Sequence, residues 1–285
     1  MLGQRVVTAV VLLAVLAAAL AAGNPGWFTA LLAVAAACAC WEWLRLTLPQ
    51  PPSRTLCIGV AAAMLALMLW LAWTWLSGQP AGTAWGAAIV RWLVPAVAAI
   101  WLLAVVPAVV RGRADKPAAG MGWSLFSVPA VLAAWSALAL MYLSGGGWFV
   151  VSLLALVWIA DIAAYFAGRA FGRRKLAPRV SPGKTIEGAV AGILGAVLWV
   201  WVSSMWAGSF GAALVERGSL WLALPAAAVL GAISIVGDLF ESLLKRRAGR
   251  KDSSALLPGH GGVYDRIDAI LPVAPFAMLL SGVLS

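Results

Sequence analysis

The sequence predicts an all-α integral membrane protein, and three observations support this fold class. Of its 285 residues, 64% are apolar and only 11% are charged, whereas soluble domains are about 45–50% apolar and about 25% charged. The apolar residues form runs long enough to cross roughly 30 Å of hydrocarbon as helices. The basic residues lie almost entirely on one side of these runs. Together the observations exclude a soluble globular enzyme.

Nine transmembrane helices are predicted from apolar runs that are bounded by charged residues, glycine or proline. They lie near residues 5–22, 27–46, 55–77, 91–110, 123–143, 147–168, 188–207, 219–240 and 267–284. The start of the fourth run is vague, because Gly78, Pro80 and Gly82 interrupt an apolar stretch, so that helix could begin several residues earlier.

The distribution of Lys and Arg predicts a cytoplasmic N-terminus and a C-terminus outside. With this orientation 18 of the 20 basic residues are cytoplasmic, and only Arg91 and Arg217 are outside. The net charge of +10 is therefore interpreted as topology and contact with anionic headgroups, not as nucleic-acid binding. We expect a multi-pass protein of the cytoplasmic (inner) membrane. Residues 1–24 also resemble a signal peptide, but the short connection to the second run favours a retained helical hairpin.

The acidic residues locate the chemistry, because a carboxylate within a span costs about 2.5–3.5 kcal/mol and is normally kept for a task. Glu42, Asp115 and Glu216 lie at span ends or in short loops, and we expect no role for them. The other seven acidic residues are Asp161, Glu187, Asp238, Glu241, Asp252, Asp265 and Asp268. We therefore divide the chain into a transmembrane scaffold, 1–145, and a catalytic region, 146–285, with two polar cytoplasmic loops.

Four of these carboxylates are expected to converge at one depth of the inner leaflet. Asp161 and Asp238 precede the basic ends of their spans by eight and seven residues, which places them about 12 and 10 Å deep at helical rise. Asp265 and Asp268 are spaced i,i+3 and share one helix face. A cluster of hard oxygen ligands beside open water suits Mg²⁺. A helix cap or an interhelical hydrogen bond is the alternative role for each aspartate.

The loop before the seventh run is expected to bind an anion. Ser181 as N-cap and Pro182 at the first helical position would begin a helix here, leaving free N–H groups beside Lys184. The alternative is a basic loop that only enforces orientation. Gly188 and Gly192 form a GxxxG pattern whose expected role is helix packing.

The second polar segment, residues 237–268, combines charges of both signs with several glycines. Such glycines allow the backbone to approach a ligand closely, as an anionic substrate held through a metal would require. A lone histidine is more often structural than catalytic, so both roles stay open for His260.

This segment resembles the C-terminal signature of the phosphatidate cytidylyltransferases, also called CDP-diacylglycerol synthases. The signature stands here as Ser242, Lys245-Arg246, Lys251-Asp252, Pro258-Gly259-His260-Gly261-Gly262 and Asp265-Arg266-Ile267-Asp268. Three further segments are similar to the family: the one around Asp161, residues 181–188 and residues 237–242. The resemblance covers roughly residues 155–270, whereas the first 150 match only as apolar spans.

The resemblance implies transfer of a cytidylyl group from CTP to phosphatidic acid at the cytoplasmic face, in phospholipid biosynthesis. It also implies a homodimer and a metal centre with Mg²⁺ and, at a second site, K⁺. Asp238 and Asp265 would hold the metal, with Asp161 and Asp268 completing or orienting its ligand shell. Asp238, Asp265, Lys184 and His260 are the expected catalytic residues. The expected substrate-binding residues are Ser181, Thr185, Lys245, Arg246, Lys251, Gly261, Gly262 and Arg266.

Three other functions compete with this interpretation. A CTP-dependent lipid kinase would release CDP instead of pyrophosphate. A polytopic transporter with an intramembrane aspartate relay would also place carboxylates within helices, but it is disfavoured because the polar segments are long cytoplasmic loops and no inverted repeat is visible. A purely structural scaffold would not require the histidine-glycine segment or the paired aspartates.

Overall fold

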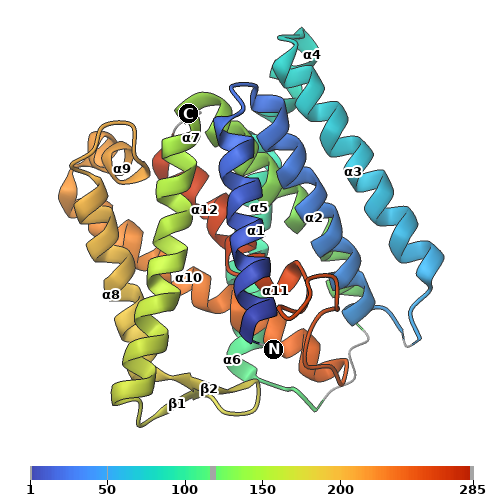
Figure 1. Cartoon of the computed structure of the whole chain (residues 1–285), viewed down its shortest axis with the longest axis vertical. Helices are drawn as coiled ribbons and strands as arrows, with labels where there is room; N and C mark the ends of the chain where they lie inside the picture. Colours follow the sequence, from blue (N-terminus) through green and yellow to red (C-terminus); the bar gives the residue numbers. More distant parts are fainter. Residues whose placement is uncertain (1, 50, 116–119, 283–285) are drawn as a thin grey trace.

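The computed structural model describes residues 2–49, 51–115 and 120–282, with side chains described from residue 7 onward. These residues form a bundle of helices with one small hairpin (Figure 1). The first part comprises α1 (Leu2–Ala21), α2 (Pro25–Thr47), α3 (Arg54–Leu76), α4 (Pro80–Ala88), η1 (Ile89–Leu93), α5 (Val94–Ile100), η2 (Trp101–Val105), α6 (Val106–Arg111) and α7 (Met121–Phe171). The second comprises β1 (Lys175–Ala177), β2 (Ser181–Thr185), α8 (Ile186–Ser203), α9 (Phe210–Gly218), α10 (Leu220–Arg247), α11 (Tyr264–Ile267) and α12 (Ile270–Ser281).

The predicted helical membrane-protein class is confirmed, whereas the count of nine spans and the orientation stay predictions. Six helical segments among the described residues are long and apolar enough to cross a membrane. One of them, α7, has 51 residues and turns at Gly146, whose φ is +80°, so it contains the two predicted spans 123–143 and 147–168. The apolar part of α1 (Val7–Ala21) and the 12-residue α12 are shorter.

The fourth predicted span begins earlier than Arg91. A continuous helical segment of 32 residues runs from Pro80 to Arg111, with two π-helical turns, η1 and η2, inside it. Pro80 stands at the helix start, where its missing N–H costs nothing. Arg91 therefore lies within a candidate membrane span and not in a loop.

The GxxxG prediction is confirmed, because Gly188 and Gly192 let α8 pack closely against α7. A Cβ at Gly188 would lie 2.7 Å from the carbonyl oxygen of Ala164, and one at Gly192 would lie 2.9 Å from that of Ala160. Small residues at these positions allow the two backbones to approach. This packing fixes Asp161, one residue after Ala160, beside the start of α8.

An aromatic cluster joins the N-terminal part of the chain to the C-terminal part. The Trp43 ring of α2 stacks on Tyr264 of α11 at 5.2 Å and meets Phe240 of α10 edge-on at 5.4 Å. All three side chains are almost fully buried. Helix α2 of the N-terminal region thus packs directly against the segment that carries the signature.

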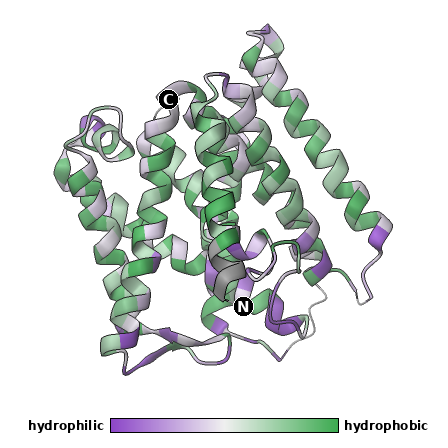
Figure 2. Ribbon diagram, viewed as in Figure 1, coloured by the Kyte–Doolittle hydropathy of each residue, from purple (hydrophilic) through white to green (hydrophobic). Residues whose placement is uncertain are grey.

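The expected helix start at Ser181 and Pro182 is wrong. Residues Ser181–Thr185 form strand β2, which pairs antiparallel with β1, and the N-cap of α8 is Thr185, whose hydroxyl accepts a hydrogen bond from the Gly188 N–H. Proline is compatible with an edge strand as well as with the first turn of a helix. The hairpin, the α10–α11 loop and most hydrophilic segments lie at one end of the bundle (Figure 2).

Candidate functional site

A cavity of about 740 Å³ lies between the C-terminal half of α7, β2, α8, α10 and α11. Asp161, Asp238, Asp265 and Asp268, the four carboxylates expected to converge, all line it. The convergence follows from fixed helical rise, because α7 and α10 carry their aspartates at similar distances from the same polar end.

Cationic side chains line the same cavity. The Lys184 ammonium of β2 lies 2.6 Å from Oδ2 of Asp238 on α10, and both side chains are about one-third exposed. Arg169, Arg266, Ser181 and Thr185 also line the cavity. Three of the residues predicted to contact substrate, together with Lys184, therefore surround the carboxylates.

A buried ion-pair network lies beside the cavity, at the end of α10. The Lys245 ammonium lies 2.5 Å from Oε2 of Glu241 and 2.6 Å from Oδ1 of Asp265. Glu241 is almost fully buried, and removing one partner of a buried pair typically costs about 3–5 kcal/mol. Lys245, predicted to bind substrate, is thus engaged with two carboxylates and does not line the cavity.

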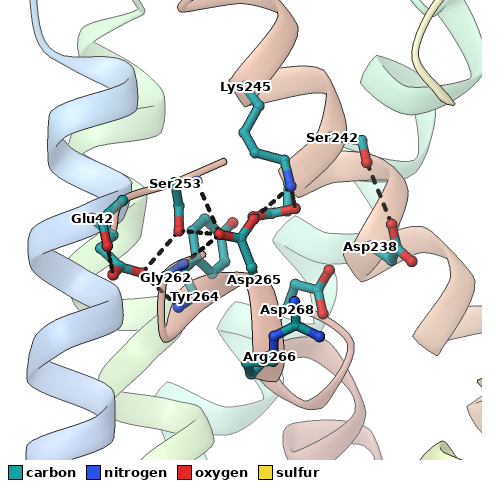
Figure 3. Close-up of polar contacts among 12 residues, drawn as sticks. Glu42, Asp238, Ser242, Lys245, Ser253, Gly262, Tyr264, Asp265, Arg266 and Asp268 are labelled. Carbon is teal, nitrogen blue, oxygen red and sulfur yellow. Dashed lines mark hydrogen bonds and ion pairs between the residues drawn. The ribbon is translucent and has the colours of Figure 1, made fainter. Parts of the chain in front are cut away.

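Asp265 organises the loop that precedes it (Figure 3). Its Oδ2 accepts hydrogen bonds from the backbone N–H and hydroxyl of Ser253, at 3.0 and 2.8 Å, and from the Gly262 N–H at 2.7 Å. Burial alone would raise the pKa of Asp265, but hydrogen bonding with Glu241, Lys245 and the Gly262 N–H holds that pKa well below its usual range. The carboxylate is therefore ionised and largely committed to protein donors.

Glu42, for which the sequence suggested no role, anchors the same loop from α2. The side chain is fully buried. Its Oε2 accepts from the Tyr264 N–H at 2.6 Å and lies 3.0 Å from the Ser253 hydroxyl, whose single hydrogen it shares with Oδ2 of Asp265. Its Oε1 accepts from the Ser254 hydroxyl at 2.5 Å and the Val263 N–H at 3.1 Å. A carboxylate has about four acceptor sites, so these contacts use most of the hydrogen-bonding capacity of Glu42. The scaffold region thus positions the signature loop (Figure 3).

The two glycines of the histidine-glycine segment are required by this arrangement. Gly261 has a φ of +82°, a conformation that favours glycine. A Cβ on Gly262 would lie 2.0 Å from the Ser253 hydroxyl and 2.5 Å from both carboxylate oxygens of Glu42. Gly262 is therefore a packing requirement of the loop, and it does not line the cavity.

The remaining predicted residues lie outside the cavity lining. The His260 carbonyl accepts two hydrogen bonds from the Arg266 guanidinium, at 3.1 and 2.6 Å, and the His260 Nδ1 is buried without a partner among the described residues. Arg246 donates to the Val180 carbonyl at 3.3 Å, and Lys251 is exposed. Of the predicted basic ligands, Lys184 and Arg266 line the cavity, whereas Lys245 contacts Asp265 from outside it.

The carboxylates of the cavity are oxygen donors of the kind that Mg²⁺ requires. Asp161, Asp238 and Asp268 present oxygen donors to one cavity, as a hard cation prefers. Oδ1 of Asp265 accepts a hydrogen bond from the Lys245 ammonium. Within the described ranges, no three carboxylate, histidine or cysteine side chains already form a metal-binding group. Instead, the Lys184 ammonium is the cation beside Asp238. The donor chemistry fits a divalent cation once Lys184 is exchanged for it.

Comparisons with known proteins agree with the signature. The model described as the cytidylyltransferase family matches residues 3–284. The phosphatidate cytidylyltransferase of Pseudomonas aeruginosa is 47% identical over 154 residues, which cover 53% of this chain and 54% of that protein. The enzyme of that name from Haemophilus influenzae is 46% identical over 133 residues, covering 46% of this chain and 44% of that protein. The match thus spans about half the length of these curated relatives.

Proposed function

The chain belongs to the cytidylyltransferase family, and from this premise we propose that it transfers the cytidylyl group of CTP to phosphatidate. The products would be CDP-diacylglycerol and pyrophosphate. The relatives named phosphatidate cytidylyltransferase support the choice of reaction. We further propose that the protein lies in the cytoplasmic membrane with its cavity open to the cytoplasm, and that it forms a homodimer.

The observation that carries this proposal is the composition of the cavity. Its polar part contains four carboxylates with Lys184 and Arg266, and its apolar part is lined by Trp158, Leu176 and Ile235. A site for this reaction must admit a soluble nucleotide and a membrane lipid together. Charged groups beside apolar residues at the polar end of a membrane bundle meet that requirement.

The proposed reaction is an in-line displacement. An oxygen of the phosphatidate phosphate attacks the α-phosphorus of CTP, and the bond from that phosphorus to the oxygen bridging to the β-phosphate breaks, so that pyrophosphate leaves. The lipid phosphate is already ionised near neutral pH, so no strong general base is needed. Catalysis then depends on positioning and on neutralising charge.

Lys184 is proposed to bind the triphosphate. Without substrate its ammonium is paired with Asp238 at 2.6 Å, which keeps both charges compensated in the cavity. When nucleotide enters, the ammonium would transfer to a phosphate oxygen, and Arg266 lies in the same cavity to add a second positive charge. Lys184 thus links substrate binding to the release of the Asp238 carboxylate.

Mg²⁺ is proposed as the cofactor, held by Asp161, Asp238 and Asp268 together with Oδ1 of Asp265. When bound, it would supply neutralisation of the triphosphate charge. The chain's own residues then have distinct tasks: the aspartates hold the cation, Lys184 and Arg266 bind phosphate, and Glu42 fixes the loop that carries Asp265.

The test uses purified protein in detergent with phosphatidate, Mg²⁺ and CTP labelled at either the α- or the γ-phosphate. We expect the α-label in a liponucleotide and the γ-label in pyrophosphate. A lipid that carries the γ-label would instead identify a CTP-dependent lipid kinase. If neither labelled lipid forms and sealed vesicles take up substrate, the transporter would be favoured.

A further inference from the structure

A second cavity lies away from the carboxylate-lined one, where α3, α4, η1 and the first half of α7 meet. Its volume is about 670 Å³, and apolar residues such as Val90, Leu140 and Leu143 contribute much of its lining. In Figure 1, α4 lies at the end of the bundle opposite the β1–β2 hairpin. Nothing in the proposed reaction uses this cavity.

Arg91 is the charged residue that lines the second cavity. It lies on the π-helical turn η1 inside the candidate span Pro80–Arg111, and such turns are frequent at functional sites. Its side chain is exposed, and within the described part of the chain its assigned contact is the Trp92 ring, 5.2 Å from the guanidinium carbon. An arginine in this environment favours an anionic partner from outside the chain.

The position of Arg91 along its helix fits a lipid phosphate. Twenty residues separate Arg91 from Arg111, which corresponds to roughly 30 Å at α-helical rise and slightly less with two π-helical turns. That is about the thickness of the hydrocarbon core. With Arg111 at the boundary near the hairpin, this spacing would place Arg91 near the headgroup level of the opposite leaflet.

Trp75 also lines this cavity, and its indole nitrogen lies beside Gly86, another lining residue. Its indole N–H is buried and has no hydrogen-bond partner among the described residues, and its ring is held by stacking on Trp135 at 5.2 Å. A buried donor without an acceptor costs about 1–3 kcal/mol. An oxygen atom of a bound molecule would remove that cost.

We propose that this cavity binds one phospholipid from the leaflet opposite the carboxylate-lined cavity. The phosphate would pair with Arg91, an ester or phosphate oxygen would accept the Trp75 N–H, and an acyl chain would contact the apolar lining. The lining is mostly apolar, although it also contains Thr74, Gln79 and Thr83. A cation and one unsatisfied donor in such a lining match a phospholipid better than a soluble nucleotide. This inference does not depend on the proposed reaction.

Native mass spectrometry of the purified protein tests the proposal. Phosphatidylglycerol, or diacylglycerol with the same acyl chains, is added in detergent, and retained lipid is counted. Wild type should retain one phosphatidylglycerol. Arg91→Gln should bind this lipid about tenfold more weakly than wild type, and Trp75→Phe should also bind it more weakly. Arg91→Lys should restore part of the retention. The matched controls, Arg54→Gln and Trp221→Phe, change exposed residues outside the cavity and should retain lipid like wild type.

Four results would overturn the proposal. Equal retention by Arg91→Gln and wild type would remove the role of the guanidinium, and equal retention of diacylglycerol would remove the role of the phosphate. Displacement of the lipid by millimolar inorganic phosphate would identify a free-phosphate site. A shift from dimer to monomer in Arg91→Gln with unchanged lipid retention would assign the cavity to a subunit contact. Thermal melting of each variant verifies that it is folded.

Discussion

Replacing Glu42 by glutamine should disable the site although Glu42 does not line the cavity. Each of its carboxylate oxygens contacts one serine hydroxyl and accepts a hydrogen bond from one backbone N–H, that of Val263 on Oε1 and that of Tyr264 on Oε2. In Glu42→Gln one oxygen becomes an NH₂ group. A serine hydroxyl can reverse and accept, but a backbone N–H cannot, so either amide orientation leaves one buried N–H facing another donor.

The free-energy cost of Glu42→Gln follows from the number of hydrogen bonds that it disrupts. Losing one hydrogen bond to a charged group and leaving a buried donor unsatisfied costs about 2–3 kcal/mol. If this cost falls on the loop that carries Asp265, the rate of conversion at low CTP should fall roughly 30- to 150-fold. The substitution preserves side-chain shape, so the helical bundle should stay folded.

The assay measures the formation of α-labelled lipid by Glu42→Gln, together with hydrogen–deuterium exchange of residues 253–264. We expect a lower rate and faster exchange in that loop. Glu216→Gln is the matched control, because it makes the same chemical change at an exposed residue. A Glu42→Gln protein with wild-type rate and wild-type exchange would refute the anchoring role.

Three further predictions concern the loop, the phosphate ligand and the metal. Gly262→Ala places a Cβ 2.0 Å from the Ser253 hydroxyl, so a strain of about 1–3 kcal/mol should lower both the melting temperature and labelled-lipid formation; unchanged values would contradict the packing. Lys184→Gln should raise the KM for CTP roughly tenfold or more, as loss of a charge-assisted hydrogen bond requires, and an unchanged KM would exclude it as a phosphate ligand. Chelation should abolish turnover and added Mg²⁺ should restore it; full activity in a chelator would exclude the metal.

The structure also changes which aspartate gives the clearest test. In Asp265→Asn, the amide would disturb the Ser253 and Gly262 hydrogen bonds to Oδ2 or the Lys245 ion pair on Oδ1. A loss of activity could then come from the disturbed loop as well as from a lost metal ligand. Asp238 lines the cavity, and among the described residues its assigned partners are Lys184 and Ser242. Asp238→Asn is therefore the more direct substitution.

Much of the site could be predicted from the sequence because helical rise is constant. Asp161 and Asp238 lie at known distances from the basic ends of their helices, so their common depth required no tertiary information. Lys184 could be assigned to the same region because its loop directly follows the helix that carries Asp161. The close packing of α8 on α7 followed from Gly188 and Gly192.

The parts that could not be predicted depend on contacts between distant segments. Glu42 and Ser253 are 211 residues apart, and no local pattern connects them. Glu42 and Asp161 both lie within predicted spans, so the cost of inserting a carboxylate into the membrane applies to both. That cost could have identified Glu42, but its position near the end of its span suggested no role. Ser181 and Pro182 suit a helix start and an edge strand equally well, and pairing with β1 decides between them.

The central claim is that cytidylyl transfer takes place in the cavity lined by Asp161, Asp238, Asp265 and Asp268. Its most direct test compares wild type, Asp238→Asn and the exposed-loop control Asp115→Asn for transfer of the α-label from CTP to phosphatidate in the presence of Mg²⁺. The account predicts labelled CDP-diacylglycerol from wild type and the control, and at least a hundredfold less from a folded Asp238→Asn protein. Wild-type turnover by Asp238→Asn would contradict it.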